Sequence, residues 1–182
     1  ITGPNGGGKT SLLRTILRLQ SPTKGRISFF RQGEPVSSLD MGYLPQKNSI
    51  DSRFPITVEE VVASGLMGNT QKGNTKFDSK KEIDEMLDLM GITALRNKPI
   101  GVLSGGQLQR SLFGRALISK PEMLILDEPA SYIDRQFGNR MFEILRDLSS
   151  NGTTIMMVSH EIEPFITLSN RNLYINHILG DL

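Results

Sequence analysis

The sequence contains no cysteine and no tryptophan, only two histidines, and few aromatic residues, which make up 6% of the chain. The lack of cysteine excludes disulfides and thiolate metal sites, and it is compatible with a reducing compartment. With so few histidines besides, the chain is poorly equipped to bind a transition metal itself. Long apolar runs are also missing, because none approaches the ~20 residues of a membrane-spanning helix. Any association with a membrane would therefore go through a protein partner.

An excess of charge of one sign is missing as well. Lysine and arginine number 21 and the acidic residues 19, which leaves a net charge of +2. Because the basic residues are dispersed along the chain, the charge pattern does not favour nucleic acid, and no such partner is expected. The 182 residues, 37% hydrophobic and 22% charged, have the composition of a globular protein. They suffice for one domain, or for a core with a small added subdomain.

The hydrophobic pattern alternates between two periods and so predicts an α/β protein. Short apolar runs predict strands at 25–30, 41–44, 123–126, 153–158 and 172–175. Helical spacing predicts helices at 10–19, 57–66, 79–90, 106–119 and 134–149. Thr57 and Glu60 have the spacing of a capping box at the start of the second of these helices.

The distribution of the predicted strands divides the chain, because the pattern from residue 47 to 100 shows helices and no convincing strand. We therefore predict a single domain over 1–182, with a mainly parallel sheet in the core formed by 1–46 and 121–182, and an inserted helical subdomain at 47–120. Ile1 and Thr2 lead directly into a glycine-rich loop and leave no room for the strand that usually precedes such a loop. We expect that strand to lie in a preceding segment.

The glycine-rich loop, Gly3 to Thr10, reads Gly-Pro-Asn-Gly-Gly-Gly-Lys-Thr and has the spacing of a phosphate-binding loop. Its consecutive glycines let backbone amides point at phosphate oxygens, and the start of the following helix adds partial positive charge. Lys9 supplies a charge for the β and γ phosphates, and Thr10 a hydroxyl for Mg²⁺. A chance glycine-rich turn is the alternative, which the fixed spacing and the following helix disfavour. The predicted nucleotide-binding residues are Asn5, Gly6, Gly7, Gly8, Lys9, Thr10 and Ser11.

Asp127 and Glu128 directly follow the apolar run 123–126. The predicted strand should deliver both acids to the carboxyl edge of the sheet, where α/β folds bind ligands. Neighbouring strand residues point to opposite sides, so we expect Asp127 to bind Mg²⁺ through water and Glu128 to polarise the attacking water. The alternative is a solvated pair that caps a turn at Pro129. The phosphate loop in the same chain favours the catalytic interpretation.

The pentad Leu103 to Gln107 reads Leu-Ser-Gly-Gly-Gln and precedes the acidic strand. Ser104 could cap a helix that starts near Gly106, and a capped helix start beside glycines is also an anion site. Because Gly3–Thr10 already forms one phosphate site, a second such site requires a second phosphate. Two antiparallel copies that share each nucleotide would satisfy this requirement with a closed twofold interface. The predicted residues of this second site are Ser104, Gly105, Gly106 and Gln107.

Gln46 and His160 are further candidates, and each of them follows a predicted strand. Gln46 comes after the strand 41–44 and offers a neutral amide to Mg²⁺ or to the water. His160 comes after the strand 153–158, from where it could reach the γ phosphate. An isolated residue of either type is more often a surface or capping residue, so both depend on the motifs around them.

Taken together, these segments resemble the nucleotide-binding domain of the ATP-binding cassette (ABC) ATPases, which has a P-loop NTPase core, over nearly the whole chain. Leu103–Gln107 resembles the signature motif, Ser131–Asp134 the D-loop, Gln46 the Q-loop glutamine and His160 the switch histidine. The resemblance implies hydrolysis of ATP with Mg²⁺ by a homodimer, in which the pentad contacts the nucleotide of the partner copy. It also implies an integral membrane permease that docks around residues 53–58, and indirectly a solute-binding protein. The location would be cytoplasmic, at the inner face of the cell membrane.

The stretch Met41–Val62 is similar to the zinc and manganese importer ATPases, which share Pro-Gln-Lys followed by Phe-Pro and Thr-Val, and Leu103–Arg110 fits the same group. The adenine-stacking aromatic of the family lies upstream of the phosphate loop and has no counterpart here, and Tyr132 and Ile133 are unusual inside the D-loop. The sequence thus predicts the ATPase subunit of a metal importer. The alternatives are an importer ATPase for other cargo, a soluble ABC ATPase that acts on ribosomes or DNA, and a nucleotide-binding module without turnover.

Overall fold

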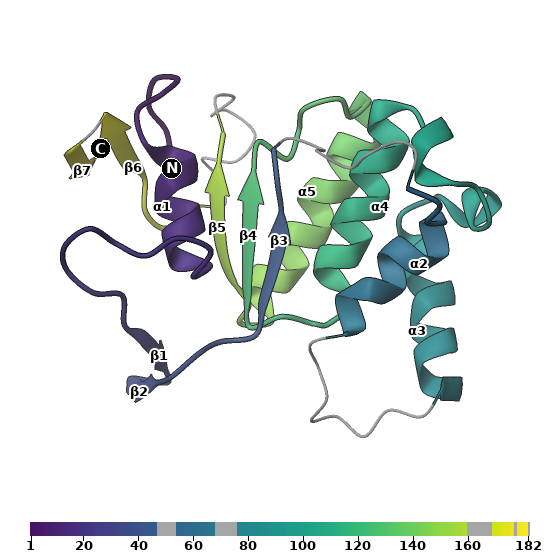
Figure 1. The fold of residues 1–182 in the computed structure, drawn as a ribbon, viewed down its shortest axis with the longest axis horizontal. Coiled ribbons are helices and arrows are strands. Elements are labelled where there is room, and N and C mark those ends of the chain that lie inside the picture. The colour runs from purple at the N-terminus through teal and green to yellow at the C-terminus, as the bar shows by residue number, and fades with distance from the viewer. Residues whose placement is uncertain (47–53, 68–75, 160–168, 177, 182) are drawn as a thin grey trace.

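The computed structural model describes residues 1–46, 54–67, 76–159, 169–176 and 178–181. Its centre is a parallel sheet of three strands in the order β3–β4–β5 (Figure 1). These strands are Met41–Leu44, Met123–Asp127 and Thr154–Val158. The register pairs the first residue of β3 with the first of β4, and the first of β4 with the first of β5. The three strands predicted for this part of the sheet are confirmed.

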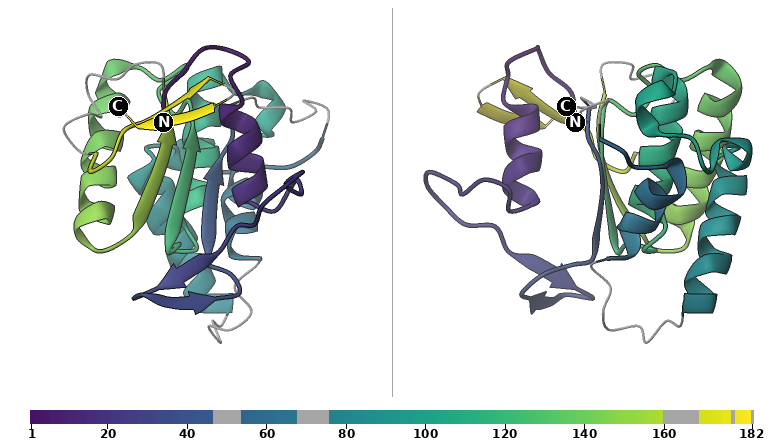
Figure 2. Two further views of the ribbon diagram at one scale, coloured as in Figure 1. Left: turned by 90° about the vertical axis from the view of Figure 1, so that its left-hand side faces the viewer. Right: turned by 45° about the vertical axis from the view of Figure 1, so that its right-hand side comes forward.

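Helices cover both faces of this sheet (Figure 2). α1 (Lys9–Ile16) packs on one face, whereas α4 (Gly105–Leu117) and α5 (Arg135–Ser150) cover the other. α2 (Val58–Ala63) and α3 (Lys76–Leu89) pack against α4 and against each other. Short 3₁₀ turns are found at Ser64–Leu66, Thr93–Leu95 and Ile100–Val102. The arrangement confirms the predicted α/β fold class.

β4 is the central strand, and all five of its residues are buried. Ile125 belongs to the apolar cluster beneath α1, whereas Leu124 and Leu126 belong to the larger cluster beneath α4 and α5. Within that larger cluster, the rings of Phe113 and Phe137 meet edge to face with their centroids 6.5 Å apart. A parallel strand covered on both faces needs apolar residues at every position. This explains the unbroken apolar run that precedes the two acids.

Ile1 and Thr2 take a place in the sheet between β5 and β6 (Leu173–Asn176). The terminal amino group of Ile1 donates to the carbonyl of Met157 in β5 at 2.6 Å, and the amide of Thr2 donates to the first carbonyl of β6 at 2.8 Å. β6 also pairs antiparallel with β7 (Ile178–Asp181), a strand that the sequence did not predict. The sequence indicated no room for a strand before the phosphate loop, but these two residues already bridge the neighbouring strands.

The predicted strand at 25–30 differs from the structure. It is replaced by a hairpin of β1 (Phe29–Arg31) and β2 (Glu34–Val36), which pair antiparallel. The turn residues Gln32 and Gly33 have φ angles of +53° and +87°, as a two-residue turn of type I′ requires. Gln-Gly is a weaker hairpin signal than Asn-Gly, and this explains why the sequence pattern did not reveal the second strand.

Some helix boundaries differ from the sequence prediction, whereas the predicted start of α2 is confirmed. Thr57 caps α2 in the predicted capping box, because its side chain accepts from the amide of Glu60 and its own amide donates to the Glu60 carboxylate at 2.8 Å. α3 begins at Lys76 rather than at 79. α1 ends at Ile16 rather than at 19, since Arg18 has a φ of +58°, which no helix continues.

Gly42 of β3 allows α4 to lie directly on the sheet. A Cβ atom at this position would be 2.1 Å from the backbone oxygen of Ala116 in α4.

The division into a core of 1–46 and 121–182 and a helical subdomain of 47–120 stays a prediction. The helices in the described part of the chain are all too short or too polar to span a lipid bilayer.

Candidate functional site

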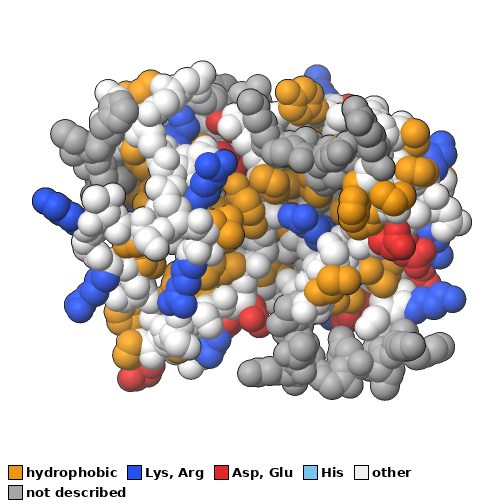
Figure 3. Space-filling view, viewed as in Figure 1, with side chains coloured by type: hydrophobic (Ala, Val, Ile, Leu, Met, Phe, Trp, Pro, Cys, Tyr) orange, Lys and Arg blue, Asp and Glu red, His pale blue; other side chains and the backbone are white. Residues whose placement is uncertain are grey.

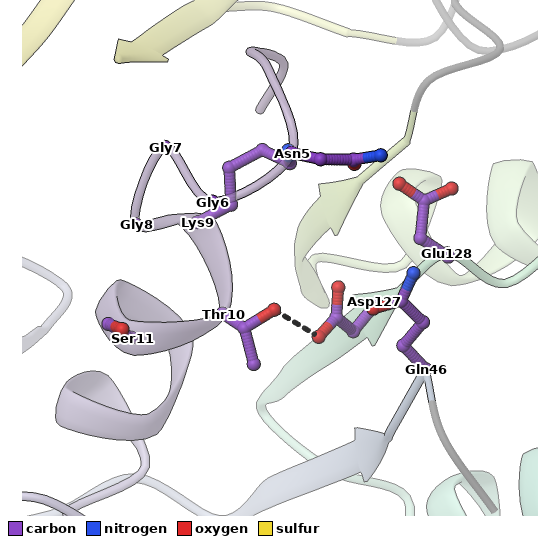
Figure 4. A pocket seen from close by; sticks show the side chains of 10 residues that line it. All are labelled: Asn5, Gly6, Gly7, Gly8, Lys9, Thr10, Ser11, Gln46, Asp127 and Glu128. Carbon is purple, nitrogen blue, oxygen red and sulfur yellow. Dashed lines mark hydrogen bonds between the residues drawn. The ribbon is translucent and has the colours of Figure 1, made fainter. Parts of the chain in front are cut away.

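The glycine-rich loop curls between Thr2 and the start of α1, and it forms one wall of a pocket (Figure 4). Gly6 and Gly8 have φ angles of +78° and +99°, which side-chain-bearing residues rarely adopt. Gly8 precedes α1, and no side chain caps the helix there. The first amides of a helix have no partner within the helix, so this uncapped start can donate to an anion.

Lys9 is largely buried, with 8% of its surface exposed, and its side chain folds back over the loop. Its Nζ donates to the carbonyl oxygens of Gly3 at 2.8 Å and Pro4 at 2.9 Å. The ammonium group is therefore held at the mouth of the loop by neutral acceptors. An anionic phosphate oxygen would be a stronger acceptor at the same position, because charge-assisted hydrogen bonds are roughly twice as strong as neutral ones.

Thr10 and Asp127 face each other across the pocket. The Thr10 hydroxyl donates to Oδ2 of Asp127 at 3.1 Å. Oδ1 of the same carboxyl is buried and has no hydrogen-bond partner among the described residues. Burial raises the pKa of the Asp127 carboxyl, whereas the bond from Thr10 and the charges of Lys9 and Arg14 act in the opposite direction. Carboxylate and hydroxyl oxygens are the ligands that Mg²⁺ prefers, and this pair fits that ion chemically.

Glu128 follows at the carboxyl end of β4 in a left-handed backbone conformation, with a φ of +53°. Its amide donates to the carbonyl of Val158 at 2.9 Å, so the backbone here remains attached to β5. The side chain is 9% exposed and lines the same pocket. Figure 4 shows the Glu128 and Asp127 carboxyl groups in different directions, with Gln46 reaching toward them from the end of β3.

The pocket gathers most of the predicted site residues, and its volume is about 180 Å³. Its lining consists of Asn5, Gly6, Gly7, Gly8, Lys9, Thr10, Ser11, Gln46, Asp127 and Glu128. These residues come from the loop before α1, from the first turn of α1, and from the ends of β3 and β4, which meet at one edge of the sheet. His160, the remaining predicted catalytic residue, lies outside the described residues.

The pentad is not part of this pocket lining. Ser104 caps α4, since its Oγ accepts from the amide of Gln107 at 3.3 Å, while Oε1 of Gln107 accepts from the amide of Ser104 at 3.1 Å. The predicted cap is thus confirmed as a full capping box. α4 and the phosphate-loop helix α1 lie on opposite faces of the sheet (Figure 2). One copy of the chain therefore separates the two predicted phosphate sites.

Two polar side chains that the sequence analysis did not single out join α4 to the segment after Glu128. Gln109 is 1% exposed and donates from Nε2 to the carbonyl of Pro129 at 3.3 Å. Arg110 forms an ion pair with Asp134 and lies over the ring of Phe137, 4.4 Å from its centroid. The sequence did carry a signal for Gln109, because it is a polar residue at a position where the helical pattern predicts burial. Its acceptor is a backbone carbonyl, which no side-chain motif reveals.

The comparisons with known proteins agree with this geometry. The sequence profile described as ABC transporter matches residues 1–131. A protein named as a probable metal transport system ATP-binding protein of Chlamydia pneumoniae is 40% identical over 186 residues, which cover 100% of this chain and 75% of that protein. The zinc uptake system ATP-binding protein ZurA of Listeria monocytogenes is 38% identical over 187 residues, which cover 99% and 70%.

A solved structure shows the same fold. It is the dimeric, post-hydrolysis state of the ATP-binding cassette MJ0796 bound to ADP and Pi, with a TM-score of 0.82 at 24% identity. The superposition covers 100% of this chain and 83% of that one. This likeness bears on the fold alone, and it confirms the predicted P-loop NTPase fold.

Proposed function

The chain belongs to the ABC transporter family, and we propose that it is the ATP-hydrolysing subunit of a transporter that imports a divalent metal ion such as zinc or manganese. The observation that carries the proposal is the pocket in which the phosphate loop meets Asp127 and Glu128. The cargo is proposed from the two relatives that are named for metal transport and zinc uptake. The Pro-Gln-Lys and Phe-Pro segments after β3 support the same cargo.

The phosphate loop and Lys9 bind the triphosphate of ATP in this proposal. Backbone amides from Gly6 to Thr10 face the β and γ phosphates, and the start of α1 adds the positive end of its dipole. Lys9 exchanges its present acceptors, the carbonyls of Gly3 and Pro4, for a phosphate oxygen. The exchange replaces two neutral acceptors with a charged one and so favours the bound state.

Asp127 and Thr10 are the residues that would hold Mg²⁺, with Gln46 beside them. The fit rests on the buried Oδ1 of Asp127, which lacks a hydrogen-bond partner in the described part of the chain, and on the adjacent Thr10 hydroxyl. When bound, the ion neutralises charge that develops on the β and γ phosphate oxygens. Thr10 and Asp127 hold each other in place, so the oxygens are positioned before the ion arrives.

Glu128 orients and polarises the attacking water. As the water oxygen bonds to the γ phosphorus, the bond from that phosphorus to the bridging oxygen breaks, and ADP carries away the electron pair. The Glu128 carboxylate accepts the proton that the water loses. General-base assistance of this kind typically contributes ~10²–10⁴ in rate. His160 stays a prediction for the group that contacts the γ phosphate.

A second copy of the chain completes the site. The pentad Ser104–Gln107 caps a helix on the other side of the sheet and does not line the pocket. A helix start with this capping geometry offers amides to an anion, and two antiparallel copies would bring each pentad to the pocket of the other. The dimer therefore holds two nucleotides, each between the phosphate loop of one copy and the pentad of its partner.

A membrane permease is the proposed protein partner, with the solute-binding protein acting through the permease. The proposed docking residues 53–58 are described from Phe54 onward, and Phe54 is 58% exposed. Met67 and Val102, in the same helical part of the chain, are 81% and 69% exposed. Figure 3 shows apolar side chains gathered over the side of the molecule that carries α2 and α4. The subunit would lie at the inner face of the cell membrane.

Mixed dimers test the shared site with matched sets of mutations. In the first dimer, one protomer carries Lys9→Ala and its partner carries Ser104→Ala. If the sites are shared, this dimer keeps one intact site. In the second, one protomer carries both changes and its partner carries none, which leaves no intact site. We expect ATP hydrolysis in the first dimer and little in the second. The reverse result would show that each protomer works alone and would exclude the proposed arrangement.

Metal content of cells tests the cargo. Cells whose only copy carries Glu128→Gln should accumulate less zinc or manganese than cells with the control Glu122→Gln, which changes a half-buried acid paired with Arg31 away from the pocket. Unchanged zinc and manganese in the first variant, with ATP hydrolysis abolished, would exclude metal import and leave the ATPase assignment intact.

A further inference from the structure

The first half of α4 is fixed to the segment that leads from Glu128 to α5. Nε2 of Gln109 donates to the carbonyl of Pro129, the residue directly after Glu128. Gln109 is buried, so water cannot readily replace this hydrogen bond. At the other end of the segment, Arg110 pairs with Asp134, which also caps α5 by accepting from its third amide at 2.9 Å.

The same segment lies directly against the start of α4. A Cβ atom at Gly106 would be 2.7 Å from the backbone oxygen of Tyr132, and one at Gly105 would be 3.4 Å from the Tyr132 side chain. The glycines of the pentad therefore leave space for the segment. A movement of the start of α4 toward the segment would displace it at Tyr132.

Two residues of this region have backbone conformations that only surrounding contacts can maintain. Glu128 has a φ of +53° and Tyr132 a φ of +68°, and neither is glycine. Such conformations persist when neighbouring structure fixes them. Val158 fixes the amide side of Glu128 through its carbonyl, and Gln109 holds the peptide group that follows Pro129. The Ser131 amide also donates to the Glu128 carbonyl at 3.2 Å, so without Gln109 the described hydrogen bonds still hold Glu128 on both sides, but none of them engages the Pro129 carbonyl.

We propose that Gln109 is a positioning residue for Glu128. When the pentad at the start of α4 is displaced, Gln109 moves with α4 and displaces Glu128 of the same chain. The inference rests on the proposed function, in which Glu128 acts on one nucleotide while the pentad contacts the other. Gln109 then links the two nucleotide sites of the dimer. A chain whose pentad is displaced at one nucleotide would have its Glu128 carboxylate moved away from the attacking water at the other, since small displacements of catalytic groups reduce rate strongly.

Gln109→Met tests the positioning role, because methionine keeps the length of the side chain and removes the donor. In the complete protein we expect kcat for ATP to fall about tenfold, part of the ~10²–10⁴ that a general base supplies, with KM unchanged. Ser111→Ala is the matched control on the same helix. It removes a partly buried hydrogen bond to the Gln107 carbonyl, 2.9 Å long, that does not involve the segment after Glu128. An unchanged kcat in Gln109→Met would overturn the proposal.

The double variant with Glu128→Gln distinguishes positioning from general damage. If Gln109 acts through Glu128, Gln109→Met should leave the residual single-turnover rate of Glu128→Gln unchanged. An equal fractional loss in both backgrounds would mean that Gln109 acts elsewhere, and the proposal fails. Gln109→Glu covers the case in which methionine disturbs folding. The new carboxyl group can donate to the Pro129 carbonyl only when it is protonated. The kcat of this variant, relative to that of the parent, should therefore recover as the pH is lowered. Absence of that recovery contradicts the proposal.

Mixed dimers show which site Gln109 serves. When one protomer carries Lys9→Ala, the single working site uses the pocket of the partner. Gln109→Met should lower turnover about tenfold when placed in the partner, whose Glu128 is in use, and not when placed in the Lys9→Ala protomer. The opposite pattern would assign Gln109 to the pentad and overturn the inference. Failure of the shared site itself would appear separately, because Ser104→Ala in the Lys9→Ala protomer would then leave turnover intact.

Discussion

The hydroxyl of Thr10 donates a hydrogen bond of 3.1 Å to Oδ2 of Asp127, so the first turn of α1 and the end of β4 meet across 117 positions of the chain. The contact depends on α1 packing over the sheet, where Leu13 and Ile125 are fully buried in one apolar cluster. That packing leaves Thr10 above the end of β4 and directs its hydroxyl at the acid. The pair is thereby positioned by the core and needs no ligand to bring it together.

Asp127→Asn should weaken the binding of ATP only when Mg²⁺ is present. The variant keeps an acceptor for Thr10 but loses the charge, and we expect the affinity for MgATP to fall roughly 10–100-fold, as for other residues around a metal ion. Titration calorimetry with ATP, in Mg²⁺ and in excess chelator, measures the difference. Asp147→Asn, at an exposed position of α5, is the control. An equal loss with and without Mg²⁺ would show that Asp127 acts on folding or on the nucleotide itself.

Glu128→Gln should abolish turnover and retain nucleotide. The amide cannot accept the proton of the attacking water, so kcat should fall by ~10²–10⁴ while ATP still binds. Steady-state phosphate release measures turnover. Size-exclusion chromatography with ATP measures nucleotide retention and should show an accumulated dimer. Glu122→Gln, before β4, is expected to behave as the parent does. Undiminished hydrolysis in Glu128→Gln would refute the assigned role.

Gly42→Ala and Gly138→Ala should change stability in opposite directions. The added methyl at Gly42 would meet the Ala116 backbone oxygen at 2.1 Å, so α4 must shift and the stability should fall by about 1–3 kcal/mol or more. Gly138 lies within α5 with no atom within 4 Å of an added Cβ, and alanine there should add up to about 1 kcal/mol. Urea unfolding followed by circular dichroism measures both. Similar values for the two variants would contradict the close packing of α4 on β3.

In Asp134→Asn, the free energy of unfolding should change less with pH in the acid range than it does in the parent. The amide of Phe137, and with it Arg110, lowers the pKa of Asp134 below its ordinary value of 3.8, although burial acts against the shift. A carboxyl with a lowered folded-state pKa contributes stability that is fully present above the unfolded pKa and is lost as pH falls through the folded pKa. Asparagine keeps the cap and cannot titrate.

The parent should therefore be more stable than Asp134→Asn at neutral pH, and the gap should close below about pH 3.8. Urea midpoints measured at a series of pH values test this expectation. A gap that stays constant through the acid range would show that the charge of Asp134 contributes nothing to stability, either through the Phe137 amide or through Arg110.

Local features were predictable because their causes lie within a few residues. The capping boxes at Thr57 and Ser104 join residues three positions apart, and both are present as the spacing indicates. The apolar run before Asp127 indicated a buried strand, and β4 is buried throughout. The β1–β2 hairpin was missed because its turn, Gln32-Gly33, carries a weak signal, and only strand pairing makes it visible.

The sequence by itself determined the family, the α/β class and the position of the glycine-rich loop, since spacing and local hydrogen bonding encode them. Only the tertiary structure decided which of the predicted groups meet. It brings Thr10 and Asp127 together, and it places the Ser104 pentad on the other side of the sheet. It also joins Gln109 to the carbonyl of Pro129, 20 positions away. The reason is physical: such contacts depend on how helices pack over a sheet, and that packing depends on the summed burial of distant apolar residues rather than on any local pattern.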